Sequence, residues 1–146
     1  MDQDFVRTPF HCYVALFDIS VYIDALVLND DRHLNNIAVL SQNGKFDYCP
    51  IFDQGAGLLS NTQMSPMDIM PKALIAALLA RPFNTTFNRQ MHTIQSLYGK
   101  QLHIRKFNRQ ELIDALQPLL PYYASRDRGI ITDRVCEAIL TRQKTL

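Results

Sequence analysis

Three polar side chains, Asp31, Asn36 and Asp53, have the types and the spacing that phosphoryl transfer requires. Asp31 and Asn36 stand five residues apart in the polar segment 29–36, and Asp53 follows seventeen residues later, within 50–55. In this chemistry one carboxylate orients the acceptor hydroxyl and receives its proton, while an amide oxygen and a second carboxylate hold Mg²⁺ on the phosphates of the donor. We therefore predict that Asp31 is catalytic, and that Asn36 and Asp53 bind the metal and with it the cofactor.

A run of apolar residues, 13–28, precedes the polar segment. It is apolar on nearly all sides, which is typical of a helix buried in the middle of a domain. Asp24, inside this run, indicates a buried hydrogen bond. Arg32 is expected to pair with a neighbour or, alternatively, to contact a phosphate. The polar segment thus begins where a buried helix is predicted to stop, at Asn29.

Two short β-prone runs, 37–40 and 46–49, separate the polar segment from the second aspartate. The dipeptide at 43–44, Asn-Gly, lies between them and is a strong signal for a two-residue hairpin turn. An antiparallel hairpin brings its two outer ends together. We therefore expect Asn36 and Asp53 to lie close in space.

Two further residues belong to the predicted site. His33 could act as a base or bind phosphate, although we favour a structural hydrogen bond that holds the loop. We keep His33 as the second candidate catalytic residue, after Asp31. Gly55, which with Gly57 flanks Ala56, is expected in a flexible turn and is predicted to bind the cofactor. The first glycine of the chain is Gly44 and the first lysine is Lys45, so neither a glycine-rich phosphate lid nor a phosphate-pairing lysine precedes the polar segment.

The remainder of the chain carries helix signals. Four helices are expected: 72–80 after Pro71, 87–98 before Gly99, one opened by the capping-box sequence 108–111, and 132–143 with Val135, Ile139 and Leu140 facing inward. The fold class predicted from these patterns is mainly α with a small β-hairpin, in a single domain spanning 1–146.

Composition narrows the classes of partner. The 146 residues are 47% hydrophobic and 20% charged with a net charge of +1, which is typical of a globular protein and carries no polyanion-binding signature. The basic run 100–109 is expected to be a solvated loop, so we predict no direct binding of nucleic acid. The acidic start of the chain argues against a signal peptide, and the apolar run 13–28 is too short and too charged to span a membrane. We expect a cytoplasmic protein with no membrane contact.

The motifs together resemble a known family. Asp31-Arg-His-Leu-Asn-Asn36, with Pro50-Ile-Phe-Asp53, resembles the C-terminal domain of HipA-like serine/threonine kinases, especially the compact CtkA-like members. Arg81-Pro-Phe83 with Phe87-Asn-Arg-Gln90 is a weaker second match. The resemblance implies a protein-kinase-like C-lobe, Mg²⁺ and ATP as cofactors, and a protein serine or threonine hydroxyl as acceptor. It assigns Asp31 as catalytic and both Asn36 and Asp53 as metal-binding.

The family's N-terminal lobe, which bears the phosphate-covering loop and the lysine, is expected to be absent, since few residues precede position 13. The chain by itself is therefore expected to be inactive. A partner bearing the missing lobe, or an antitoxin, is a candidate binding partner, and the biology implied is either a toxin–antitoxin pair or signalling.

Three rival interpretations remain. Phosphoinositide-type lipid kinases share the Asp-Arg-His-x-x-Asn spelling, but Phe52 precedes Asp53 here and Gln54 follows it, which favours the HipA-like family. A non-catalytic interaction domain that retains the scaffold is the second rival. The third is a metal-dependent phosphohydrolase with the candidate ligands Asp30, Asp31, His33 and Asp53.

Overall fold

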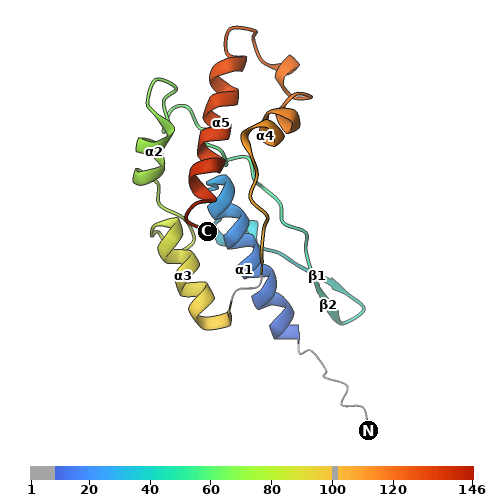
Figure 1. Ribbon diagram of the computed structural model, residues 1–146. Helices are drawn as coiled ribbons and strands as arrows, with labels where there is room; N and C mark the ends of the chain where they lie inside the picture. The colour runs from blue at the N-terminus through green and yellow to red at the C-terminus, as the bar shows by residue number, and fades with distance from the viewer. Residues whose placement is uncertain (1–8, 100–101) are drawn as a thin grey trace.

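The apolar run near the start of the chain forms α1 (Pro9–Val27), which runs from the edge of the molecule at its N-terminal end to the middle at its C-terminal end (Figure 1). The computed structural model describes residues 9–99 and 102–146. α1 packs against α3 (Phe87–Tyr98) and against α5 (Arg128–Arg142). Its second half is buried, as expected for a helix that is apolar on nearly all sides.

The hydrophobic core lies between α1 and α3. Its buried members come from α1 and the residue after it, the loop after Asp53, the α2–α3 connection, α3 and α5: Val21, Tyr22, Ala25, Leu28, Leu59, Ala80, Phe87, Met91, Ile94 and Ala138. The polar segment 29–36 leaves this core directly at the end of α1. The candidate site is thus attached directly to the hydrophobic core.

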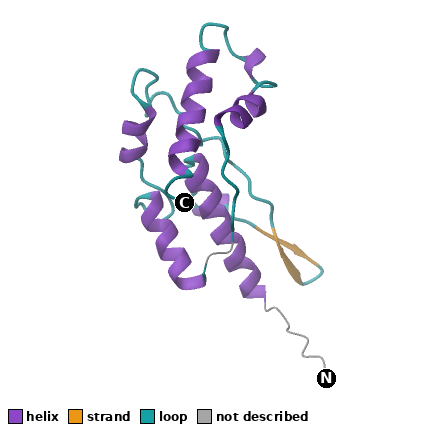
Figure 2. Cartoon of the chain, in the orientation of Figure 1, coloured by secondary structure: helices purple, strands orange, loops and turns teal. Residues whose placement is uncertain are grey.

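The predicted hairpin is present as β1 (Val39–Gln42) and β2 (Lys45–Tyr48), an antiparallel pair (Figure 2). Gln42 pairs with Lys45, so Asn43 and Gly44 form the two-residue turn, both with positive φ. That conformation at both positions is what an Asn-Gly turn adopts. The strands are each shifted by one or two residues from the predicted runs.

The remaining helices are mainly those expected. α2 (Pro71–Ala77) begins at its proline but ends three residues before position 80, because Leu78 is already extended. α3 begins after the N-cap Thr86 and ends at Gly99, as predicted. The capping box at Asn108 and Glu111 is present at the start of α4 (Arg109–Leu116). Two short 3₁₀ turns complete the described elements, η1 (Leu34–Asn36) and η2 (Leu120–Tyr122).

The prediction for the last helix was wrong in its start and its buried face. α5 begins at Arg128 rather than at 132, and its buried residues are Arg134, Cys136, Ala138 and Arg142. Small side chains allow α1 to approach closely, and the two arginines donate to backbone carbonyls rather than facing water. The apolar residues assigned to the inward face (Val135, Ile139 and Leu140) are only partly buried.

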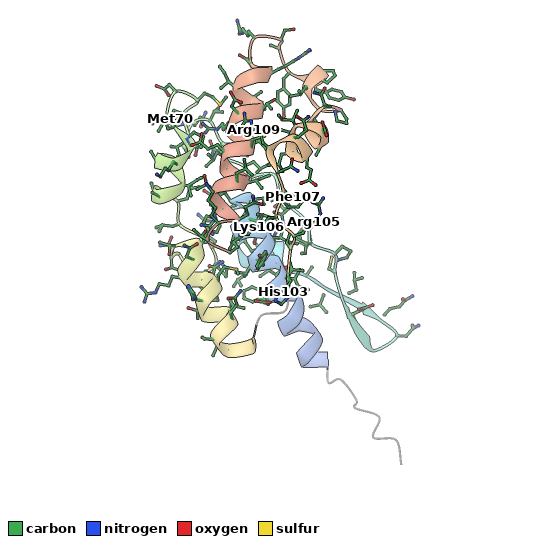
Figure 3. All side chains as sticks on the ribbon, viewed as in Figure 1. Met70, His103, Arg105, Lys106, Phe107 and Arg109 are labelled. Carbon is green, nitrogen blue, oxygen red and sulfur yellow. The ribbon has the colours of Figure 1, made fainter. Side chains whose placement is uncertain are left out.

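The basic run is exposed, as predicted. Lys100 lies outside the described residues; Figure 3 shows the others on the segment between α3 and α4 and at the start of α4: His103, Arg105, Lys106 and Arg109. In the described residues no helix is both long and apolar enough to cross a membrane.

Candidate functional site

Asp31 stands in the loop that joins α1 to η1. The loop turns sharply because Leu28 is left-handed (φ 58°) and the Asn29 amide donates back to the Asp24 carbonyl oxygen at 2.9 Å. The Asp31 side chain is 49% exposed, and one of its carboxylate oxygens accepts from Arg81 Nη1 at 3.1 Å. The predicted catalytic carboxylate is therefore accessible and carries one cationic partner.

Asn36, at the end of η1, is buried and oriented by Asp31. Its side-chain Nδ2 donates to the Asp31 carbonyl oxygen at 3.1 Å. Within the described residues its Oδ1 accepts no hydrogen bond, so this oxygen remains available as a ligand.

A buried arginine joins the two ends of the hairpin. Arg32 is only 1% exposed, and its Nε and Nη2 each donate to one Asp24 carboxylate oxygen at 2.9 Å. Its Nη1 donates to the Asn36 carbonyl oxygen at 2.9 Å and to the Phe52 carbonyl oxygen at 2.8 Å. One nitrogen thus holds the residue predicted as a metal ligand and the residue before Asp53, which confirms that the hairpin ends are close. The alternative that Arg32 contacts a phosphate is wrong, because its guanidinium is buried against Asp24.

Asn29 extends the same buried network. Its side chain has no exposed surface, and its Nδ2 donates to Asp24 Oδ1 at 3.0 Å and lies 3.4 Å from the Asp53 carbonyl oxygen. Asp24 therefore accepts from both Arg32 and Asn29, which bears out the buried hydrogen bond predicted for it. Buried charges are costly unless they are paired and hydrogen-bonded, and Asp24 meets both conditions.

Asp53 is exposed and adopts a left-handed backbone conformation, with φ at 58°. Asp tolerates this region better than most residues, but it still costs free energy, and such positions gather at functional sites. The contact from Asn29 to its carbonyl oxygen and the Arg32 bond to the preceding carbonyl both favour this conformation. The buried network thus reaches from Asp24 to the backbone of the second predicted metal ligand.

The turn after Asp53 is more constrained than the predicted flexible one. A Cβ at Gly57 would lie 3.2 Å from the carbonyl oxygens of both Val27 and Gln54, so this glycine allows a close approach to the end of α1. Gly55 is exposed; a Cβ there would lie 4.0 Å from Asp53 Oδ1, an ordinary contact. Packing therefore favours glycine at Gly57, and the predicted cofactor-binding role of Gly55 stays a prediction.

The loop that follows is fastened to α5 by Arg134. This buried side chain donates to the carbonyl oxygens of Ser65 at 2.6 Å, Pro66 at 3.2 Å and Leu59 at 3.4 Å. Burial lowers the pKa of Arg134 below its usual range. The loop is ordered by a contact that no local sequence signal shows.

His33 does not make the side-chain hydrogen bond expected of it. Its ring Nδ1 is buried and has no hydrogen-bond partner among the described residues. The bond that holds the loop comes instead from the His33 backbone amide, which donates to the Asp31 carbonyl oxygen at 2.8 Å. Its catalytic role stays a prediction.

Arg81 was missed as a site residue by the sequence reasoning. It stands fifty residues from Asp31, in the connection between α2 and α3, and its side chain is 56% exposed. Its motif, Arg81-Pro-Phe83, was noted only as part of a resemblance. It also lines a pocket of about 420 Å³ beside the site, together with Phe17, His33, Leu34, Pro82 and Phe83.

Asp30 adds a second carboxyl group beside the site. Its pKa is raised, first by burial and then by the charge of Asp31, while a hydrogen bond from its own backbone and the charge of Arg81 act the other way. Among the described residues no three or more His, Cys, Asp or Glu side chains form a group that could hold a metal. The donor set predicted for a divalent cation, Asn36 with Asp53, stays a prediction. This set suits Mg²⁺, which takes few protein oxygens and completes its shell with water and phosphate.

Scans against protein-family models, curated proteins and solved structures found no match for this chain.

Proposed function

We propose that this chain is the C-lobe of a HipA-like serine/threonine kinase, which uses Mg-ATP to phosphorylate a protein hydroxyl. One observation supports the proposal: Arg32 Nη1 donates to both the Asn36 and the Phe52 carbonyl oxygens, which brings the backbone of Asn36 close to that of the residue before Asp53. A buried ion pair that serves only stability can often be replaced by apolar packing. The contacts of the Arg32–Asp24 pair with the backbone beside Asn36 and Asp53 therefore favour a positioning role.

Each side chain then has a defined part. Asp31 orients the acceptor hydroxyl and receives its proton, since its carboxylate is exposed next to Arg81. Asn36 Oδ1 and the Asp53 carboxylate would hold Mg²⁺, which neutralises charge on the phosphates when bound. The Gly55 carbonyl oxygen accepts from Ser60 Oγ at 2.6 Å, so its exposed backbone amide would be the group that meets the nucleotide, and His33 would assist Asp31.

The test is a calorimetric titration of Mg-ATP into the chain and its Asp53→Asn variant. We expect the wild type to bind and Asp53→Asn to lose binding by at least about tenfold, because one of two protein ligands loses its charge. Asp68→Asn, a change at another exposed aspartate of the loops, should bind like the wild type. Equal binding by the wild type and Asp53→Asn would remove Asp53 from the site.

The acceptor class needs a separate measurement. With a lobe-bearing partner added, transfer of labelled phosphate to protein rather than to phosphoinositide would support the protein-kinase assignment, and Asp31→Asn should abolish it while nucleotide binding remains. Hydrolysis of a phosphate ester without nucleotide would instead favour a phosphohydrolase.

A second candidate is an interaction domain, favoured by the apolar surface around the hairpin. Leu34 is 74% exposed, Leu40 50% and Val39 48%. An isolated two-stranded hairpin is only marginally stable in water, and exposed apolar surface of this kind often marks a binding site for another protein. We infer that this surface receives the proposed N-lobe-bearing partner or antitoxin in the cytoplasm. If the chain retains a partner through this surface but binds no Mg-ATP, the interaction-domain function replaces the kinase function.

A further inference from the structure

Phosphoryl transfer requires positive charge close to the group that moves. In the reaction proposed above, the bond between the γ-phosphorus and its bridging oxygen breaks, ADP leaves with the electron pair, and the acceptor oxygen bonds to phosphorus as its proton passes to Asp31. Charge is then spread over the three outer oxygens of the phosphoryl group, and fixed cations stabilise it.

The candidate loop contains no free cation that could do this. Arg32 is the one arginine between Asp31 and Asn36, and its guanidinium is buried, with bonds to Asp24 and to two backbone carbonyls. The first lysine of the chain, Lys45, comes only in β2. Within this chain, such a cation would have to come from outside the loop.

Arg81 satisfies this requirement by position. Its Nη1 lies 3.1 Å from Asp31 Oδ1, while its side chain is 56% exposed. Within the described residues the guanidinium donates to Asp31 alone, and because arginine has five N–H donors, most remain open to a ligand. An arginine can hold a carboxylate with one edge and a phosphate with the other.

The backbone around Arg81 is held firmly. The buried Gln90 side chain donates to the Arg81 carbonyl oxygen at 3.0 Å. Ala80 and Thr85 pair as an antiparallel bridge, which closes the turn between them. On the far side, Phe83 packs edge to face on Phe17 with ring centroids 6.2 Å apart. A cation presented from such a turn needs little reorganisation when the phosphate binds.

We propose that Arg81 is a further catalytic residue, which binds the phosphoryl group being transferred while it orients Asp31. This inference deepens the proposed function and rests on it. It predicts that Arg81 contacts the γ-phosphate of ATP, and therefore that the residue discriminates between ATP and ADP.

The experiment is a calorimetric titration of Mg-ATP and Mg-ADP into the full chain and three variants: Arg81→Gln, Arg81→Lys and Arg126→Gln. Arg81→Gln should weaken Mg-ATP binding about tenfold and leave Mg-ADP binding within about twofold, since a charge-assisted hydrogen bond to the γ-phosphate is lost. Arg81→Lys should recover part of the loss because it keeps the charge. Arg126→Gln removes the same charge at an 88% exposed side chain on the connection before α5, and should change neither affinity.

The outcomes separate the two proposals. Equal weakening of both nucleotides by Arg81→Gln, or no weakening of either, would overturn the assignment of Arg81 and leave the proposed function standing. If the wild type binds neither nucleotide, the proposed function fails and this inference fails with it. Thermal unfolding of Arg81→Gln should stay close to that of the wild type, because an exposed ion pair contributes little stability; a large drop would identify Arg81 as structural instead.

Discussion

Arg32→Met removes a guanidinium that holds four oxygen atoms: two of the Asp24 carboxylate and the carbonyl oxygens of Asn36 and Phe52. The Asp24 carboxylate would stay behind, fully buried and without its counter-charge. Leaving one member of a buried pair uncompensated costs about 3–5 kcal/mol. Asp24→Leu, which strands the arginine, should cost a similar amount.

The double variant Asp24→Leu/Arg32→Met removes both charges at once. Much of the loss should be recovered, since paired removal of buried charges is far less costly than removal of one. The carbonyl oxygens of Asn36 and Phe52 would still lack their shared donor, which leaves a residual cost of about 1–3 kcal/mol.

The assay is urea unfolding followed by circular dichroism at neutral pH. Each single variant should lower the midpoint by about 2 M, given a slope of about 2 kcal/mol per molar urea for a domain of this size. The double variant should fall between them and the wild type, so that the two changes are non-additive by at least about 2 kcal/mol. Arg126→Met, at an exposed pair, should shift stability by less than about 0.5 kcal/mol.

Additive single changes would refute the reasoning, because they would mean that Asp24 and Arg32 do not compensate each other in the folded protein. A double variant as stable as the wild type that still binds Mg-ATP normally would refute the positioning role of Arg32, even if the pair is buried.

Three more predictions concern the surroundings of the site and the capping box. Gly57→Ala should destabilise the fold by about 1–3 kcal/mol in urea unfolding, since its Cβ would lie 3.2 Å from the Val27 carbonyl oxygen; Gly55→Ala is the control, and equal effects would contradict the packing. The Glu111 pKa is lowered, first by the hydrogen bond from the Asn108 amide. The contribution of Glu111 to the free energy of unfolding is therefore present above the ordinary glutamate pKa and is lost as pH falls through the lowered value. Glu111→Gln should make stability fall less steeply over this acid range, and an unchanged slope would contradict the prediction. Burial raises the pKa of Asp30, so its contribution to the free energy of unfolding is complete at low pH and is lost as pH rises through the raised value. The free energy of unfolding of Asp30→Asn should therefore increase relative to that of the wild type from acid to neutral pH. A difference that stays constant with pH would contradict this prediction.

Local signals predicted most of the secondary structure. The Asn43-Gly44 turn, the capping box at Asn108 and the C-terminal Gly99 are each set by interactions within a few residues, and each is present in the structure. The buried face of α5 was not predictable in this way. Its buried arginines donate to distant carbonyl oxygens, such as that of Ser65, sixty-nine residues from Arg134. Hydrophobic periodicity does not predict partners of this kind.

The sequence by itself determined the donor atoms of the candidate site: two carboxylates and an amide at spacings that a hairpin can bring together. That step depends only on residue type and on a turn whose geometry is local. Tertiary structure alone decided how they are held, because Arg32 bridges two chain segments from a buried pair with Asp24, and Arg81 reaches Asp31 from fifty residues away. The physical reason is that a charged side chain is stable either in water or next to a compensating partner. Which of the two occurs depends on the distant parts of the chain that the fold places beside it.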